Sequence, residues 1–245
     1  MNEGIPLYYI NPKDGTELVL IPGGWYWMGA REDDQEAGSD EKPRHLHYVE
    51  LFYLGIACIT VAQFQKFVKE TGHDPGEEWK EDPAEHPVRY VNWNDAKAYC
   101  RWANLRLPTE AEWELGARGY ESLKYPWGNE WVEGRRVCWD RQRGPKGETA
   151  PVFAHPEGVS VFGTYQQSGN VWEWCEDGGE SGIYRRYPQN DFIVPDKGEY
   201  RVVRGGSWRS SNQGYFRGSD RLDYDPGLRS WYACRGFRAA RTVTF

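Results

Sequence analysis

The sequence has no long apolar stretch, no run of basic residues and no pair of neighbouring cysteines, and each absence excludes a class of protein. No segment of the 245 residues approaches the roughly 18 apolar residues that a membrane-spanning helix needs. The formal net charge of -7 and the lack of clustered Lys and Arg exclude a general nucleic-acid binder. The first residues also lack the charged and apolar parts of a signal peptide, so we expect a cytoplasmic protein.

Cysteine is scattered along the chain. The five cysteines are odd in number and form neither a C-x-x-C motif nor a close Cys/His pair. This pattern argues against a disulfide framework and favours reduced, mostly buried thiols. The cysteines are Cys58, Cys100, Cys138, Cys175 and Cys234.

Aromatic residues and glycine are abundant. The chain contains 13 Trp, 16 Tyr and 28 Gly, although its mean hydropathy is -0.83. Aromatic rings then supply much of the buried area, and the glycines allow tight turns between short elements. We expect one domain over residues 1–245, with little regular secondary structure.

Local patterns predict several short elements. Two apolar runs flank a Pro-Gly-Gly turn at residues 17–29, which predicts a β-hairpin. Capping boxes at Thr60 and Thr109 predict helices that begin there, the first of them ending at Gly72. The other expected elements are strands at 45–51 and 87–91, a helix at 93–104, an aromatic turn at 125–129, and loops at 31–42, 74–86 and 135–150, the first of these loops exposed.

Two polar groups admit a structural and a chemical interpretation. His45 and His47 would share a strand face, as metal ligands do, but no third ligand lies nearby in the sequence. Glu110, Glu112 and Glu114 place three carboxylates in five residues, yet a first helical turn favours acidic residues in any case. We favour the structural interpretation for both groups.

Residues 209–235 differ from the rest of the chain. The segment contains Ser, Gly, Asp and aromatic residues but no Lys, Glu, Ile, Val, Thr or Met. No helical or strand period runs through it, so we expect long surface loops held at both ends by the flanking RGGSW and GFR motifs. Long ordered loops commonly carry function.

Several motifs together resemble one known family. In order, they are IPGGWYWMG, H-x-V-x-L, ITVAQFQKFVKETGH, RLPTEAEWE, YPWGNEW, GNVWEW, RGGSW and GFR. This series resembles the formylglycine-generating enzyme family, also called the sulfatase-modifying factor domain, over roughly residues 17–241. The resemblance implies an α+β fold, a variant of the C-type lectin-like fold with short strands, two or three helices and many ordered loops.

The catalytic chemistry of that family is not matched. Its oxidase members hold copper with two cysteines just beyond the GGS motif, because soft thiolates select Cu(I). Here Trp208, Arg209 and Ser210 follow Ser207, and Cys234 is the only thiol of the C-terminal region. Related enzymes that make sulfur-nitrogen antioxidants use three iron-binding histidines in an added N-terminal domain, whereas the five histidines here are scattered. We therefore expect a protein without enzymatic activity.

A calcium site is a further implication of the resemblance. Family members bind calcium at the GNxWEW segment, and this chain has Asn170 and Glu173 at the matching positions. Oxygen atoms of this kind suit calcium, a hard cation. The alternative is that Glu173 pairs with an arginine and that the two tryptophans belong to the core.

The C-terminal layout also resembles the variable proteins of diversity-generating retroelements. In these systems a reverse transcriptase rewrites adenines near the end of a gene with a lectin-like product. Residues 209–235 fit the amino acids that such changes produce, except for Gln213 and Trp231. Tyr with small polar residues is also the composition of adaptable binding surfaces.

We therefore predict a monomeric, non-catalytic protein that binds a protein or another macromolecule through residues 209–235. A metal-dependent oxidase with a rearranged site is the alternative. The predicted ligand-binding residues are Ser210, Asn212, Tyr215, Phe216, Asp220, Asp223, Tyr224, Trp231 and Tyr232.

Overall fold

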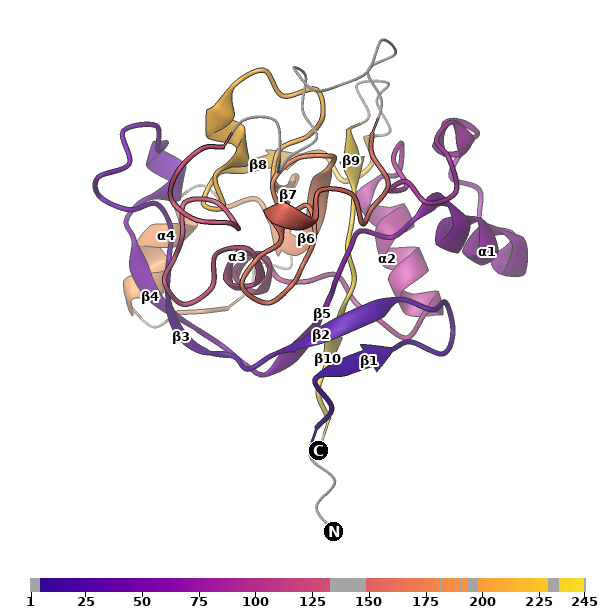
Figure 1. The fold of residues 1–245 in the computed structure, drawn as a ribbon, viewed down its shortest axis with the longest axis horizontal. Helices are drawn as coiled ribbons and strands as arrows, with labels where there is room; N and C mark the ends of the chain where they lie inside the picture. Colours follow the sequence, from indigo (N-terminus) through magenta and orange to yellow (C-terminus); the bar gives the residue numbers. More distant parts are fainter. Residues whose placement is uncertain are drawn as a thin grey trace.

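The computed structural model describes residues 5–132, 149–180, 182–189, 191–193, 198–228 and 234–244. Short strands and helices are joined by long irregular connections (Figure 1), which confirms the expected α+β class. The α-helices are α1 (Val61–Thr71), α2 (Trp93–Trp102), α3 (Glu110–Arg118) and α4 (Ile183–Arg186). The strands are β1 (Tyr8–Ile10), β2 (Glu17–Ile21), β3 (Gly24–Met28), β4 (His45–Val49), β5 (Phe52–Gly55), β6 (Trp172–Gly178), β7 (Arg201–Arg204), β8 (Arg221–Tyr224), β9 (Arg235–Gly236) and β10 (Ala240–Thr242).

The described strands form three sheets. One is antiparallel with the order β1-β2-β5-β10, and β3 and β4 form a separate two-stranded ribbon. The third sheet has the order β8-β7-β6-β9, in which β9 is parallel to β6. Figure 1 shows the first sheet at the lower end of the molecule and the third sheet in its upper half.

The predicted hairpin at residues 17–29 is wrong, although both of its strands exist. β2 pairs with β1 and β5, whereas β3 pairs with β4. Gly23 has a φ of 71°, and a Cβ there would lie 2.6 Å from the carbonyl oxygen of Val49. The turn is thus packed against the β4–β5 connection and leads the chain into another sheet. The side chains of β3 alternate between solvent and core, since Trp25 and Trp27 are exposed while Tyr26 and Met28 are buried.

The predicted helices are confirmed together with their caps. Thr60 accepts a hydrogen bond from the Gln63 amide, and α1 stops at Gly72, whose φ is 70°. Thr109 accepts in the same way from the Glu112 amide at the start of α3. All nine residues of α3 are buried, because the helix lies between the ribbon and the third sheet (Figure 1).

Aromatic rings fill the core beside α1 and α2, as the composition predicted. Phe64 of α1 contacts Phe67, Trp79 and Tyr99 with ring centroids 5.3, 5.3 and 5.9 Å away. Phe237 of the GFR motif closes the cluster from the other side, 5.4 Å from Tyr99. The GFR motif, which follows the 209–235 segment, is therefore part of the main core.

Three other expectations need correction. Residues 87–91 form no strand, since only Pro87 makes a bridge, to Thr60. The segment 209–235 is not all loop, because β8 pairs with β7 in register from Arg201 to Arg204. The stretch 31–42 is not fully exposed, because the Glu41 side chain is buried. The predicted loop at 135–150 falls mostly on residues 133–148, which lie outside the described residues.

Candidate functional site

The RGGSW motif turns the chain at the end of β7. Gly205 and Gly206 have φ values of 96° and 72°, which favour glycine. A Cβ at Gly206 would lie 2.7 Å from the carbonyl oxygen of Tyr215, and one at Gly205 would lie 3.0 Å from the Trp113 ring. The two glycines thus let the following loop fold back closely over α3.

Arg204 fixes this loop from within the protein. Its guanidinium is fully buried and donates to Glu114 of α3 at 2.5 Å and to Glu110 at 3.1 Å. The same group donates to the backbone carbonyl oxygens of Gly218 and Ser219 at 2.8 and 3.0 Å. Arg204 therefore ties the RGGSW motif, α3 and the middle of the 209–235 segment together.

The three carboxylates of α3 are partners of buried or partly buried arginines. Glu110 accepts from Arg221 at 2.7 and 2.9 Å, in addition to its bond from Arg204. Burial raises the pKa of the Glu110 carboxyl, but the positive charges of Arg221 and Arg204 outweigh this effect and hold the pKa below its usual value. Glu112 pairs with Arg106 at 2.6 Å. This arrangement agrees with the structural interpretation of these residues.

Arg217 provides a second internal anchor. Its two terminal nitrogens donate to the two oxygens of Glu41 at 2.6 and 2.7 Å, and one of them also reaches Asp34 at 3.0 Å. This pairing explains why Glu41 is buried within a stretch that is otherwise polar. Arg217 and Arg221 thus hold the loop in place from within the protein, which its polar composition did not predict.

A cavity of about 650 Å³ opens above these anchors. Tyr215 lines it, and its ring meets the Trp172 ring in a T-shaped arrangement with 6.0 Å between the centroids. Tyr224 lies over the guanidinium of Arg235 at 4.4 Å, and burial lowers the pKa of Arg235. The lining residues are Trp172, Ser207, Arg209, Ser210, Tyr215, Leu222, Tyr224, Leu228, Cys234 and Arg235.

The predicted binding residues do not all lie on this surface. Tyr215, which is exposed, and Tyr224, which is half-buried, line the cavity, whereas Asn212 and Asp223 are exposed but do not line it. Ser210 is 8% exposed but still lines the cavity, and its hydroxyl accepts from the Ser207 amide at 3.0 Å.

Two further predicted binding residues point inward. The expectation that Phe216 is exposed is wrong, because its ring is fully buried and packs beside Tyr125 and Trp131. Asp220 is largely buried beside Arg217, 3.4 Å away. Burial and the charge of Glu41 raise the pKa of Asp220 to about 7. Trp231 and Tyr232 lie outside the described residues.

Several residues that line the cavity were not predicted from the sequence. They lie either outside the 209–235 segment or on strand β8 within it. Trp172 belongs to the GNVWEW motif on β6, and Leu222 belongs to β8. The alternation of β8 could have identified Leu222 if the strand had been recognised. Trp172 carried no such signal, because a tryptophan in a motif is equally expected in the core.

Cys234 lines the same cavity and is half-buried. The other thiols that the structure describes, Cys58, Cys100 and Cys175, are buried as expected. Burial raises the pKa of all three, which keeps them protonated and unreactive. Cys138 lies outside the described residues.

The two predicted calcium ligands make protein contacts. Glu173 is fully buried, and its oxygens accept from Arg238 at 2.5 and 2.7 Å and from the Trp113 indole at 2.8 Å. The Asn170 amide exchanges two hydrogen bonds of 3.0 Å with the backbone of Ala150. A calcium ion would have to share these groups, and its binding stays a prediction.

His45 and His47 lie on one face of β4, as predicted, and both are buried. Their rings pack against Tyr184, Tyr187 and Phe192. Burial lowers the pKa of His47 to about 3, so this imidazole stays neutral at physiological pH. Within the described ranges, no three His, Cys, Asp or Glu side chains are grouped as a metal site requires, and no helix is long and apolar enough to cross a membrane.

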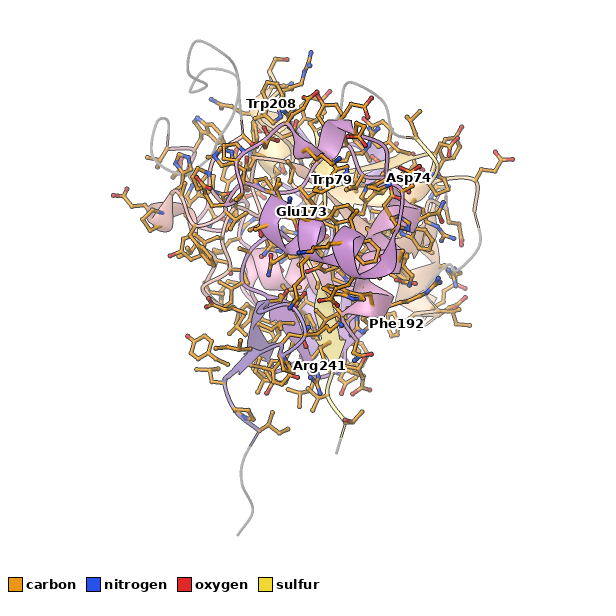
Figure 2. All side chains as sticks on the ribbon, turned by 90° about the vertical axis from the view of Figure 1, so that its right-hand side faces the viewer. Asp74, Trp79, Glu173, Phe192, Trp208 and Arg241 are labelled. Atoms are coloured by element: carbon orange, nitrogen blue, oxygen red, sulfur yellow. The ribbon has the colours of Figure 1, made fainter. Side chains whose placement is uncertain are left out.

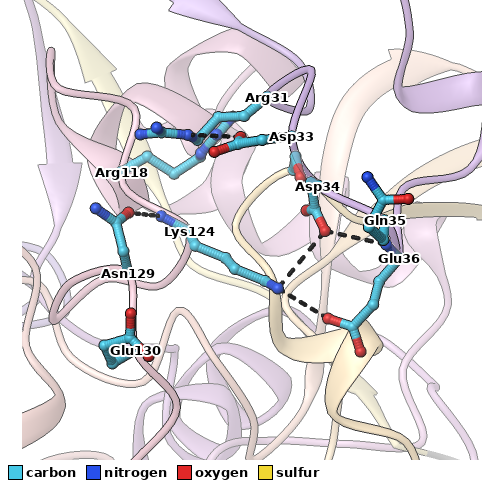
Figure 3. Close-up of a pocket in the computed structure, with 10 residues that line it drawn as sticks. Arg31, Asp33, Asp34, Gln35, Glu36, Arg118, Lys124, Asn129 and Glu130 are labelled. Carbon is cyan, nitrogen blue, oxygen red and sulfur yellow. Dashed lines mark hydrogen bonds and ion pairs between the residues drawn. The ribbon is translucent and has the colours of Figure 1, made fainter.

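A separate hollow of about 420 Å³ lies between the 31–36 stretch and the 124–130 turn (Figure 3). The ammonium of Lys124 lies between Glu36 at 2.9 Å and Asp34 at 3.5 Å, and Arg31 pairs with Asp33 at 3.2 Å. These charges are paired within the hollow, so we assign no ligand to it.

Comparison with protein families gives a match along nearly the whole chain. The model described as the sulfatase-modifying factor enzyme 1-like domain matches residues 8–243. A formylglycine-generating enzyme from Thermomonospora curvata is 34% identical, with 78% of this chain and 82% of that protein covered. The serine/threonine-protein kinase pkn1 of Chlamydia caviae is 33% identical over 93% of this chain, which spans only 38% of the kinase.

Two solved structures share the fold over almost their full lengths. PvdO from Pseudomonas aeruginosa superimposes with a TM-score of 0.82 at 25% identity, with 98% of this chain and all of that one covered. The Treponema denticola variable protein 1 superimposes with a TM-score of 0.74 at 22% identity, with 97% and 99% covered. The second similarity concerns the fold alone.

Proposed function

The chain belongs to the sulfatase-modifying factor enzyme 1-like domain family, and we propose that within this family it is a non-catalytic protein that binds a ligand in the cavity beyond the RGGSW motif. One observation carries the proposal. Just beyond the GGS motif, where the resemblance places a copper-binding cysteine pair, this chain has Arg209, Ser210 and Tyr215, and all three line an open cavity with Leu222 and Tyr224.

The chemistry of the cavity suits recognition of another molecule. Tyr215 and Tyr224 offer rigid rings that bury area at a small entropic cost. The oxygens of Ser210 and Asn212 accept from the Ser207 and Gly214 amides, so the hydroxyl of Ser210 and the NH2 group of Asn212 can still donate to a ligand. The backbone below is held by Arg204, whose hydrogen bonds do not depend on those exposed side chains. The surface can therefore change in sequence while the fold is kept.

We further propose that this surface is diversified as in a retroelement variable protein. The shared fold with the Treponema variable protein supports a scaffold of this type. Sequencing the locus in many isolates tests the proposal. We expect a reverse transcriptase gene and a near-copy of the 3′ end that differs at adenines, with substitutions at Asn212, Tyr215 and Asp223. A locus without both elements would contradict diversification and leave a binding protein of fixed sequence.

An oxidase with a rearranged metal site is the second candidate function. The identity to a formylglycine-generating enzyme and the place of Cys234 in the cavity favour it. The test is to measure copper and iron retained by the purified protein and oxygen consumption with a thiol peptide, using Cys234→Ser as the control variant. Metal-dependent oxygen consumption that is lost in Cys234→Ser would overturn the non-catalytic proposal.

A further inference from the structure

Another cavity, of about 440 Å³, lies far from the candidate site and has three basic residues in its lining. Figure 2 shows Arg241, which lines it, toward the lower end of the molecule, whereas Trp208 of the RGGSW motif lies at the upper end. Lys13, Arg106 and Arg241 all line this cavity, and none of its described lining residues is Asp or Glu. This concentration of positive charge is notable in a chain with a net charge of -7.

Three chain segments form the cavity, and backbone hydrogen bonds fix them to one another. Arg106 and Ala240 exchange two backbone hydrogen bonds of 2.9 and 2.7 Å, which join the α2–α3 connection to β10. The side chain of Asn11, in the β1–β2 turn, donates to the carbonyl oxygen of Ala103 at 3.0 Å. The walls are thus preformed, which reduces the entropic cost of binding.

Among the described residues, Arg241 is the basic side chain of this cavity that forms no ion pair with a carboxylate. Lys13 pairs with Glu70 at 2.7 Å, and Arg106 forms a two-bonded pair with Glu112. The guanidinium of Arg241 lies over the Tyr9 ring at 4.1 Å and has no carboxylate partner among the described residues. Stacking on an aromatic ring holds a guanidinium in place while its N–H groups stay free to donate.

Neutral donors lie close to Arg241. The Thr242 hydroxyl oxygen accepts from Arg106 Nε at 2.9 Å, so its own hydrogen can point elsewhere. The Asn104 side chain also lines the cavity. The nearby end of α2 does not oppose an anion strongly, because the carbonyl oxygens of Cys100, Arg101 and Ala103 already accept hydrogen bonds.

We propose that this cavity binds a phosphate group carried by a small molecule, with Arg241 as the main charged donor. A phosphate presents acceptor oxygens in several directions, and arginine is well suited to bind them. The volume exceeds that of a phosphate alone and lies within the range of small-molecule sites, so the group would arrive as an ester. The site is independent of the cavity beyond the RGGSW motif.

Titration with glycerol phosphate, followed by amide shifts in NMR spectra, tests the proposal, with glycerol as the uncharged control probe. In the wild type we expect saturable shifts at Asn104, Arg241 and Thr242 that weaken as salt is added. Arg241→Gln should weaken the affinity by about tenfold or more, because a hydrogen-bonded charge is lost. Arg185→Gln, at an exposed position on α4, should keep the wild-type affinity.

A second variant keeps the test valid if Arg241→Gln does not fold. Thr242→Val removes one donor with little change of shape at an exposed position and should weaken binding several-fold. The proposal is overturned if the wild type shows no shifts at millimolar glycerol phosphate. It is equally overturned if a folded Arg241→Gln, or Thr242→Val in its place, binds as tightly as the wild type.

Discussion

Arg238 of the GFR motif and Glu173 of the GNVWEW motif form a fully buried ion pair, with Arg238 Nη2 2.7 Å from Glu173 Oε1. The same guanidinium also donates to the backbone carbonyl oxygens of Gly55 and Tyr165 at 2.9 and 2.8 Å. One arginine therefore joins the first sheet, the third sheet and the loop before β6. Two motifs that are 65 residues apart in the sequence act as one structural unit.

Breaking this pair should destabilise the protein strongly. Arg238→Met leaves the Glu173 carboxylate buried without its partner, which typically costs about 3–5 kcal/mol of unfolding free energy. Chemical denaturation measures the loss. Glu173→Gln combined with Arg238→Met should cost clearly less than the sum of the two single changes, because the charges depend on each other.

The exposed pair of Lys80 and Glu77 provides the matched control for that experiment. Both side chains are largely in solvent, with 52% and 84% of their side-chain surface exposed. Lys80→Met should change the unfolding free energy by about 1 kcal/mol or less. A loss in Arg238→Met that is no larger than the loss in Lys80→Met would contradict the role assigned to the buried pair.

If calcium binds at residues 168–173, the thermal stability of the protein should depend on the calcium concentration. Adding calcium to protein treated with a chelator should raise the midpoint of thermal unfolding, because a ligand that binds only the folded state stabilises it. Asn170→Ala should abolish this response, since the Asn170 oxygen is a predicted ligand. Magnesium is the control ion, because it demands a smaller and more regular site. A midpoint that calcium leaves unchanged would refute the prediction.

The buried carboxyl of Asp177 should make stability fall as the pH rises. Burial and the charge of Glu110 raise the pKa of Asp177 from 3.8 to about 8. The folded state therefore holds a proton that the unfolded state releases near pH 4. The stabilisation from this proton is complete below about pH 4 and is lost progressively as the pH rises to about 8. Asp177→Asn should remove this part of the pH dependence. Relative to the wild type, the variant should therefore gain stability as the pH rises above 8.

Denaturation curves of the variant and the wild type between pH 5 and 9 measure this effect as a difference. The difference is needed because other groups titrate too, such as His47, whose pKa burial lowers to about 3. Parallel curves for Asp177→Asn would show that Asp177 titrates as in the unfolded chain.

Local features of the fold could be predicted from the sequence because their signals are local. The Thr60 and Thr109 caps each lie three residues from their partners, Gln63 and Glu112. Some strands were also readable, as the alternation of β3 illustrates, but the strand predicted at 87–91 does not exist and β8 was not predicted. Strand pairing could not be predicted, because β2 and β3 are neighbours in the sequence but pair with strands of different sheets.

The candidate site was only partly predictable for the same reason. A polar, aperiodic composition identified the 209–235 segment but could not separate exposed side chains from buried anchors. Arg217 and Arg221 become anchors only because Glu41 and Glu110, more than 100 residues away, supply the opposite charge. Phe216 is buried because Tyr125 and Trp131 meet it from another turn.

The neighbours Tyr215 and Phe216 give the sharpest test of which positions form the binding surface. Tyr215 is 38% exposed, whereas Phe216 is fully buried. Tyr215→Ala should change the unfolding free energy by no more than about 1 kcal/mol, because the side chain lies partly in solvent. Phe216→Ala should cost about 3–5 kcal/mol, because it leaves a cavity in the aromatic cluster.

Randomising single positions in a displayed library, with protease resistance as the measurement, extends this contrast to the whole segment. Asn212, Tyr215 and Asp223 should accept most residues, since a binding surface that can be diversified must not carry the stability of the fold. Phe216 and Arg217 should accept few, because their partners are buried. If Tyr215 proves as intolerant as Phe216, its ring supports the fold, and the surface available for ligand shrinks to Asn212 and the mouth of the cavity.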